Sequence, residues 1–350
     1  MVLRPVLSHT HHVHPGEKVA ILSPSWAGPA AFPRVHELGL RRLREQLGVE
    51  PVEYPTTRRL GATPQERAAD IHAAFADPEV RAVMASIGGS DQLLVLNHLD
   101  ADLIRANPKP FFGYSDNTNL LIYLWNLGIV GYHGGSTLVH LGRPGAMHPV
   151  TLESLRTALF ERKPVDIAPS PDFGDENGRW EEQVESTPEP PMRPGSGWRW
   201  HGEERRVVGP SWGGCLEILD MHLRSGRHIL DPAAYRGCVL LLETSEEMPS
   251  AEYVYRVLMG MGERGMLGEL AGVLVAAPKA WSFERPLDLP AREAYTREQE
   301  AAVLRAMGEY RPGVPIVTGV EFGHTDPQLV LPYGGEITID PAQRRLTVAY

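Results

Sequence analysis

The sequence predicts an α/β protein with two domains, and three observations support that prediction. From Lys18 onward, short runs rich in aliphatic and β-branched residues alternate with helical patterns, which indicates a parallel sheet covered by helices. A second alternating stretch begins at Arg205, after a segment of different composition. The chain of 350 residues also exceeds the length at which a single hydrophobic core usually stops growing.

The first stretch opens with the strand KVAILSP and a helix in FPRVHELGLRRLREQLG that ends at Gly48. The strand VEYPTT precedes the helix TPQERAADIHAAFAD, where Thr63 and Glu66 have the spacing of a capping box. The strand VRAVMASIGG, a short helix in DQLLVLNHL, the strand KPFFGYS, the helix NTNLLIYLWNLG and the strand IVGYHGG follow. These elements predict a doubly wound domain over residues 17–163, behind a flexible amino terminus at residues 1–16.

Residues 164–204 differ from their surroundings, because they are rich in proline, glycine and acidic residues and include Trp180, Trp198 and Trp200. A long loop without secondary structure of its own is usually functional or disordered. Disordered linkers are poor in aromatic residues, so the tryptophans favour a functional, substrate-contacting loop between the domains.

Residues 205–350 are expected to form a second α/β domain. After RRVVGPSWGGCLEILDMHL, the strands CVLLLET, AGVLVAAPKA and VPIVTGVEFG alternate with the helices SAEYVYRVLMGMGERG and REAYTREQEAAVLRAMGEY. The tail QLVLPYGGEITIDPAQRRLTVAY alternates with period two and has turns at Gly334-Gly335 and Asp340-Pro341, which predicts a β-hairpin.

Composition argues against several classes of protein. A net charge of −10 disfavours general nucleic-acid binding, which needs a basic surface. The amino-terminal sequence lacks the apolar core of a secretory signal, and no stretch approaches the roughly 20 apolar residues of a membrane span, so we expect a cytoplasmic protein with no membrane partner. Cys215 and Cys238 lie outside any CxxC pair and are expected to be free thiols. The HTHHVH run at residues 9–14 is compatible with a stray metal, but a solvated tail is expected, and we predict neither metal nor cofactor.

The sharpest chemical signal is PFFGYSDNTNLLIYLW. A hydrophobic strand ends at Gly113, Ser115 follows, and a helix begins near Asn117. A serine on such a turn lies at the carboxyl edge of the sheet, where ligands bind in open α/β folds, and the helix amino terminus favours an oxyanion. The pattern departs from G-x-S-x-G at Asn117, and the alternative is that Ser115 only caps the helix. We interpret Ser115 as the candidate nucleophile.

The run Gly88, Gly89 and Ser90 closes the preceding strand at the same edge of the sheet. Glycines allow close approach of the backbone, so an N–H near Gly89 is expected to share an oxyanion with the N–H of Asp116. The alternative is a simple tight turn.

A serine hydroxyl needs a base, and His324 follows a buried strand and a glycine in VTGVEFGHTDPQLVLP. Glu243 ends the apolar run CVLLLE, where a carboxylate is costly unless a partner such as a histidine N–H is present. The order Ser, Glu, His is that of the α/β hydrolases. For Glu243 the alternative is a helix-capping or surface acid.

Six stretches together resemble the LD-carboxypeptidase and microcin C immunity protein family of serine peptidases: VAILSPS, ASIGGSDQLLVLNHLD, NPKPFFGYSD, GGCLEIL, LLLETSEE and VEFGHTDPQLVLPYGG. The resemblance implies an N-terminal flavodoxin-like domain, a C-terminal swivelling α/β domain, a site between them and a homodimer. It also implies that Ser115 is the nucleophile, Glu243 the acid and His324 the base. The backbone N–H groups of Gly89 and Asp116 are the implied oxyanion donors.

The family has two branches. Murein LD-carboxypeptidases trim tetrapeptides in cell-wall recycling, whereas immunity-type members cleave an amide-like bond in aminoacyl-adenylate analogues such as processed microcin C. The RWEEQ segment is similar to the aromatic loop of the immunity branch, which implies that Trp180 stacks on adenine. The alternative is that Trp180 only anchors the loop.

We therefore expect a metal-independent serine hydrolase of the immunity type, acting on an aminoacyl-nucleotide or short peptide, with Ser90 also contacting the substrate. Murein tetrapeptide trimming is the alternative within the family. A non-catalytic nucleotide- or peptide-binding protein is the alternative of another class.

Overall fold

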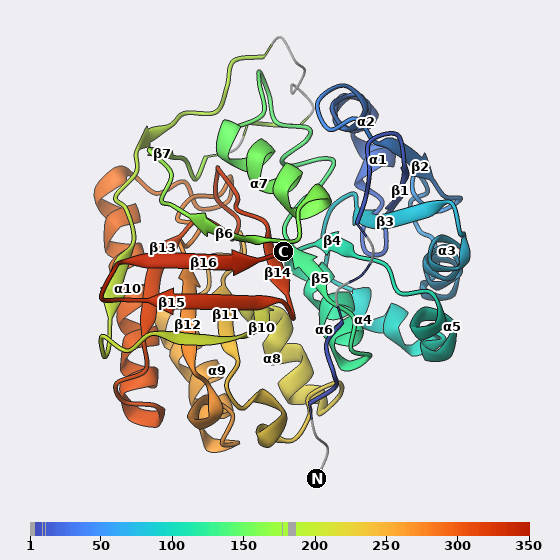
Figure 1. Ribbon diagram of the computed structural model, residues 1–350. Coiled ribbons are helices and arrows are strands. Elements are labelled where there is room, and N and C mark those ends of the chain that lie inside the picture. Colours follow the sequence, from blue (N-terminus) through green and yellow to red (C-terminus); the bar gives the residue numbers. More distant parts are fainter. Residues whose placement is uncertain (1–3, 9, 11, 177, 181–186) are drawn as a thin grey trace.

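The computed structural model describes residues 4–8, 10, 12–176, 178–180 and 187–350. Two sheets dominate this part of the chain, one built mainly from its first half and one mainly from its second (Figure 1). The first sheet has six strands and the second has eight.

The first sheet consists of β1 (Lys18–Leu22), β2 (Glu50–Glu53), β3 (Val80–Ala85), β4 (Phe111–Gly113), β5 (Gly131–His133) and β14 (Leu331–Tyr333). Their order is β14-β5-β4-β3-β1-β2, and β1 to β5 are parallel. The order 2-1-3-4-5 of the parallel strands is that of flavodoxin-like folds, which confirms the predicted fold of the amino-terminal half.

The helices of this half are α1 (Gly28–Ala31), α2 (Pro33–Glu45), α3 (Pro64–Ala76), α4 (Gln92–Val95), α5 (Ala101–Ala106), α6 (Thr118–Asn126) and α7 (Pro149–Phe160). Helix α3 begins at the predicted capping box. The Thr63 hydroxyl accepts a hydrogen bond from the backbone N–H of Glu66, and the Glu66 carboxylate accepts one from the N–H of Thr63. Such a cap is worth about 1 kcal/mol.

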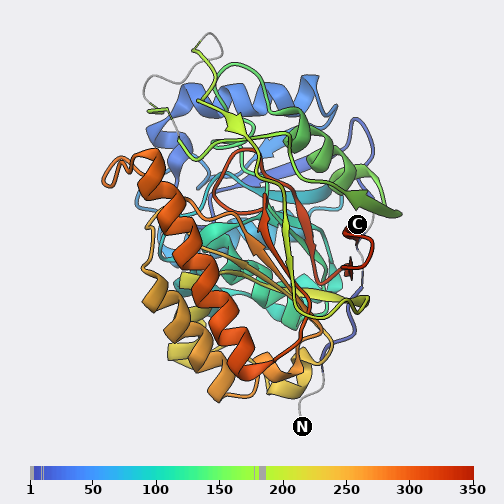
Figure 2. The same ribbon diagram turned by 90° about the vertical axis from the view of Figure 1, so that its left-hand side faces the viewer.

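The second sheet consists of β6 (Pro164–Ile167), β9 (Arg199–His201), β10 (Val207–Cys215), β11 (Val239–Glu243), β12 (Gly272–Ala276), β13 (Ile316–Val320), β15 (Glu336–Asp340) and β16 (Arg345–Ala349). Strands β10 to β13 form a parallel centre, and antiparallel strands extend both sides. The helices are α8 (Leu216–Ser225), α9 (Ala251–Glu263) and α10 (Leu289–Tyr310). The long helix α10 lies beside α9 on the outside of this sheet (Figure 2).

The carboxyl-terminal tail follows the prediction only in part. Strands β15 and β16 form the predicted hairpin around Asp340-Pro341. The turn at Gly334-Gly335 does not close a hairpin, because β14 pairs with β5 of the first sheet whereas β15 pairs with β10 of the second. Residues 331–333 thus belong to the sheet of the first half. Edge pairing of this kind depends on tertiary context, which a local alternation pattern does not contain.

The segment 164–204 contains strands where the sequence suggested an irregular loop. Strand β6 pairs with β16, and β9 pairs with β13. Two further strands, β7 (Asp172–Phe173) and β8 (Arg193–Pro194), pair with each other. These strands are only two to four residues long, too short for a periodic pattern to register. Residues 177 and 181–186, which include the end of the RWEEQ segment, lie outside the described residues.

The amino terminus contacts the body of the protein, which differs from the free tail expected over residues 1–16. Ser8 forms a β-bridge with Ile129, and the side chain of Val13 is buried. His9 and His11 of the histidine run lie outside the described residues. Among the helices that the structure describes, none has the length and apolarity needed to cross a membrane.

The two sheets meet where the candidate catalytic residues lie. The backbone N–H of Cys215, at the end of β10, donates a hydrogen bond to the hydroxyl of Thr118, the first residue of α6, over 3.2 Å. This contact joins the carboxyl edge of the second sheet to the start of the helix that follows β4.

Candidate active site

Ser115 lies on a sharp turn between β4 and α6. It begins the short 3₁₀ helix η2 (Ser115–Asn117), and its backbone φ is 60°. This left-handed conformation is uncommon for a residue other than glycine and is typical of a nucleophile elbow. The Asn117 side chain donates to the carbonyl of Ile87 over 3.1 Å and accepts from the Gln92 side chain over 2.7 Å. Asn117 therefore connects the turn to the segment that follows β3. The usual elbow pattern has its second glycine at the position that Asn117 occupies.

Gly88 is the glycine that faces Ser115, the candidate nucleophile. A Cβ placed on Gly88 would lie 3.0 Å from both Cβ and Oγ of Ser115. A Cβ on Gly89 would instead meet the hydroxyl of Ser25 and, at 3.0 Å, the backbone nitrogen of Trp26. The sequence analysis singled out this pair of glycines and predicted that the backbone N–H of Gly89 binds the oxyanion. The oxyanion roles of the Gly89 and Asp116 N–H groups stay predictions.

Replacing Gly88 by alanine is expected to lower kcat by about 10- to 100-fold, because the added methyl group displaces the nucleophile by a fraction of an ångström. The change is to be measured as kcat for any turned-over acyl substrate, with circular dichroism to follow the fold. Alanine at Gly308 in α10, where a Cβ meets nothing within 4 Å and the backbone is helical, is the matched control for adding a methyl group. Full activity of Gly88→Ala would show that Ser115 does not need this close approach.

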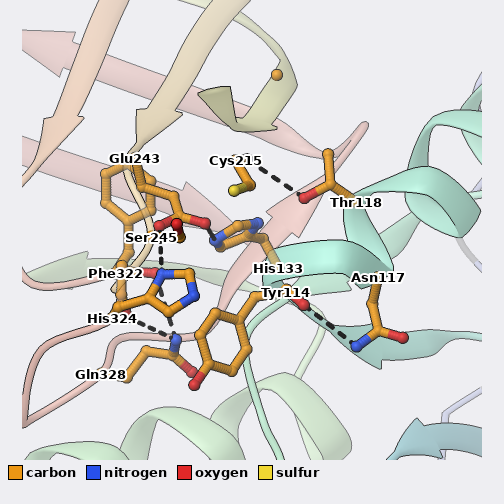
Figure 3. A network of polar contacts seen from close by, with 12 residues as sticks. Tyr114, Asn117, Thr118, His133, Cys215, Glu243, Ser245, Phe322, His324 and Gln328 are labelled. Carbon is orange, nitrogen blue, oxygen red and sulfur yellow. Dashed lines mark hydrogen bonds and ion pairs between the residues drawn. The ribbon is translucent and has the colours of Figure 1, made fainter. Parts of the chain in front are cut away.

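The predicted base and acid lie side by side on the second sheet. Glu243 ends β11, and His324 follows β13. The Nδ1 atom of His324 is 2.6 Å from Oε2 of Glu243, and both side chains are buried (Figure 3). A carboxylate at this distance favours a proton on Nδ1, and in the predicted triad Nε2 is the nitrogen that would serve Ser115.

A second glutamate, which the sequence analysis did not single out, lies at that other nitrogen. Oε2 of Glu246 is 3.1 Å from Nε2 of His324, an ion pair without hydrogen-bond geometry. Burial alone would lower the pKa of His324, but the charges of Glu243 and Glu246 outweigh it and raise the pKa to about 10. The two carboxylates thus favour the imidazolium form of His324, in which each nitrogen carries a proton.

Glu243 lies between two histidines (Figure 3). Its Oε1 atom lies 4.0 Å from Nε2 of His133, the buried last residue of β5. Burial outweighs the attraction of Glu243 and lowers the pKa of His133 to about 4. A neutral His133 leaves the charge of Glu243 to act on His324.

One cavity of about 710 Å³ connects the predicted site residues, a volume suited to a small-molecule substrate. Its lining includes Ser115, His324, Gly89, Ser90 and Trp180. Glu243 and the side chain of Asp116 are buried behind that surface. The carboxylate of Asp116 accepts hydrogen bonds from the hydroxyl of Ser25 and the backbone N–H of Gln92. The structure thus places the residues that the sequence analysis singled out in or directly behind the lining of one cavity.

Aromatic side chains form one wall of the cavity. Trp180 lies parallel to Trp26, with ring centroids 6.5 Å apart and planes 14° apart, and its edge-to-face partner Phe32 is 5.1 Å away. Trp281 and Phe283 also line the cavity. Only Trp180 was marked by the sequence, because the other aromatic residues come from loops with no motif of their own.

Positive charge also borders the cavity. Lys279 is almost fully buried there, and burial lowers its pKa to about 8 despite the nearby carboxylates of Asp175 and Glu246.

Among the residues that the structure describes, no group of three histidine, cysteine, aspartate or glutamate side chains is arranged to hold a metal ion.

Comparison with known proteins defines the class. Residues 19–134 match the family model for the LD-carboxypeptidase N-terminal domain, and residues 208–339 match that for the C-terminal domain. A protein of Streptomyces coelicolor that is classed provisionally as a carboxypeptidase is 30% identical over 95% of this chain and 94% of its own length. The chain belongs to the LD-carboxypeptidase family and is a serine peptidase-type hydrolase.

The family includes proteins of both predicted branches. A Bacillus subtilis protein, named with reservation as a murein peptide carboxypeptidase, is 27% identical over 83% of this chain and 78% of its own. The microcin C7 self-immunity protein MccF of Escherichia coli is 23% identical over 82% and 78%, respectively. The solved MccF-like protein from Streptococcus pneumoniae in complex with AMP is 24% identical, covers 96% of this chain and 99% of its own, and superposes with a TM-score of 0.84. That superposition confirms the two-domain α/β fold.

Proposed function

We propose that this enzyme uses Ser115 as its nucleophile, His324 as its general base and Glu243 as the acid that orients the base. The observation that carries the proposal is the meeting, in one cavity, of a serine on a left-handed elbow and a histidine bound to a buried carboxylate. These groups come from opposite sheets, and packing alone gives no reason for them to converge.

The proposed reaction has two steps. Oγ of Ser115 attacks the carbonyl carbon while Nε2 of His324 takes the hydroxyl proton, and the N–H groups of Gly89 and Asp116 hold the oxyanion. The bond to the leaving group breaks as His324 returns the proton, which leaves an acyl-enzyme. A water molecule then attacks the acyl-enzyme in the same way and releases the acid and free Ser115.

The substrate that we propose is an aminoacyl-adenylate analogue, cleaved at its amide-like bond. The aromatic wall around Trp180 offers a flat surface for a base, and MccF and an AMP-bound MccF-like protein are relatives. Cleavage of a murein L,D-tetrapeptide is the second candidate, because a murein peptide carboxypeptidase is also a relative. We expect the enzyme to act as a cytoplasmic homodimer.

Parallel assays with an aminoacyl-sulfamoyl adenosine and an L,D-tetrapeptide would separate these functions. We expect a kcat/KM for the adenylate analogue that exceeds the tetrapeptide value. The reverse order would assign the enzyme to cell-wall recycling. Tight binding of the adenylate without turnover or acyl-enzyme formation would identify a binding protein instead.

Trp180→Ala is expected to lower kcat/KM for the adenylate analogue by about 5- to 150-fold, equivalent to roughly 1–3 kcal/mol of lost stacking. A small acyl ester without a base should be hydrolysed at nearly the rate of the parent enzyme, because the three catalytic residues stay in place. Equal losses with both substrates would mean that Trp180 only holds its loop against the body of the protein.

A further inference from the structure

Glu246 lines the cavity and contacts the general base, yet the reaction just described gives it no role. Its side chain is 62% exposed, into the cavity, whereas the side chain of Glu243 has no exposed surface. Packing therefore fixes Glu243 and leaves Glu246 free to exchange its partner. The contact of Glu246 with His324 also lacks hydrogen-bond geometry, unlike the 2.6 Å contact of Glu243.

The position of Glu246 blocks the base. Nδ1 of His324 is held by Glu243, so Nε2 must be unprotonated to take the proton of Ser115. A carboxylate at 3.1 Å from Nε2 favours the protonated form of that nitrogen, which cannot accept a further proton. The proposed first step therefore requires that Glu246 leave Nε2.

Within the described part of the chain, Glu243 and Glu246 are the charged groups that raise the pKa of His324, and the buried histidines and the tyrosine beside it are neutral. Burial lowers the pKa of His133 to about 4 and that of His140 to about 3. Burial also raises the pKa of Tyr114, whose ring packs 4.9 Å from the His324 ring, well above its ordinary value. Removing the charge of Glu246 from Nε2 is therefore the available way to make His324 a base near neutral pH.

A carboxylate that leaves a cation in a partly closed cavity needs another cation. Lys279 acts on Glu246 from the same cavity, but it also faces Asp175 and Asp326. Three arginines also line the cavity, but Arg59 pairs with Glu66, Arg67 pairs with Asp91 and Arg179 stacks over the ring of Phe283. A substrate can bring a further positive charge. Because Glu246 touches the nitrogen that must reach the nucleophile, its carboxylate lies about two contact distances from the scissile carbonyl. An α-amino group, two bonds from that carbonyl carbon, fits this position.

We propose that Glu246 is the specificity-determining residue for a free ammonium group beside the scissile carbonyl, and that binding this group releases Nε2 of His324 for catalysis. The inference rests on the proposed triad. It assigns the acyl side of the substrate to an amino acid with an unmodified amine, whichever leaving group is attached. N-acylated substrates leave Glu246 on the base and are turned over slowly.

The test compares alanine benzyl thioester with its N-acetyl form, a pair that differs only in the ammonium group. We expect the parent enzyme to prefer the free amine by at least 10-fold in kcat/KM. Glu246→Gln should bring this preference close to one, by losing activity on the amine and gaining it on the acetylated ester. For the acetylated ester, the acid limb of the pH profile should move to lower pH, because the charge that raises the pKa of His324 is gone.

Glu247→Gln is the matched control, since Glu247 is the exposed neighbour of Glu246 and is not part of the described cavity lining. It should keep the preference of the parent enzyme. An unchanged preference in Glu246→Gln, or an equal loss on both esters, would overturn the proposal. Turnover by Ser115→Ala would instead show that the triad assignment had failed, so the two failures are distinguishable.

Discussion

Ser115→Ala is expected to lower kcat by about 10⁴- to 10⁶-fold, with unchanged secondary structure and thermal unfolding. The hydroxyl is the only group at this position that forms the acyl-enzyme, and its loss leaves a cavity wall otherwise intact. His324→Ala should have an effect of similar size, because the nucleophile then has no base. Steady-state turnover and mass-spectrometric trapping of the acyl-enzyme are the measurements.

The double variant Ser115→Ala/His324→Ala tests whether Ser115 and His324 act together as members of a triad or contribute independently to kcat. Members of a triad act as a unit, so the double variant should be hardly slower than either single variant. Multiplicative losses, or an acyl adduct that forms on another residue, would contradict the assignment.

The second large effect is expected for Glu243→Gln, which should lower kcat by about 10³- to 10⁴-fold. Glutamine has nearly the same shape, but its amide can donate to Nδ1 of His324, and this favours the tautomer with the proton on Nε2. That tautomer cannot accept the proton of Ser115. Because Glu243 contacts Nδ1 of His324 directly, over 2.6 Å, replacing its carboxylate changes which nitrogen of His324 carries the proton and leaves the surroundings in place.

Glu321→Gln is the matched control for Glu243→Gln. Glu321 is also buried near the end of β13, but its carboxylate accepts from the indole of Trp198 over 2.7 Å and from the N–H of Ser170 over 3.1 Å. It should lose some thermal stability and keep most of its kcat. If the two variants lost activity equally, the role of Glu243 would be structural.

The sequence predicted the parallel sheets and proposed the triad residues for the same physical reason. Parallel strands end at one edge of a sheet, so polar residues that directly follow apolar runs are brought to that edge. Ser115 and Glu243 both carried this signature, and His324 followed a strand and a glycine. Their convergence required only that the carboxyl edges of the two sheets face each other, which the family resemblance implied.

Other features depend on contacts between distant segments and leave no local pattern. Glu246 is one of two adjacent glutamates in the sequence, and only the fold shows which of them reaches His324. Trp26 and Trp180 come from different halves of the chain. Only the fold shows which of the two adjacent glycines faces Ser115, because a Cβ on Gly88 would meet Ser115 whereas one on Gly89 would meet Ser25 and Trp26.

Strand β14 has a consequence for how this enzyme holds together. The chain leaves β13 in the second sheet, carries His324, pairs as β14 with β5 in the first sheet, and returns to the second as β15. His324, the proposed general base, is therefore connected to the second sheet through β13 and to the first sheet through β14. If the chain were cut between its halves, β14 would be separated from its partner strand β5, so neither half is a self-sufficient module. A shift of one sheet relative to the other would move His324, so the alignment of the two sheets is a condition for the proposed proton transfer.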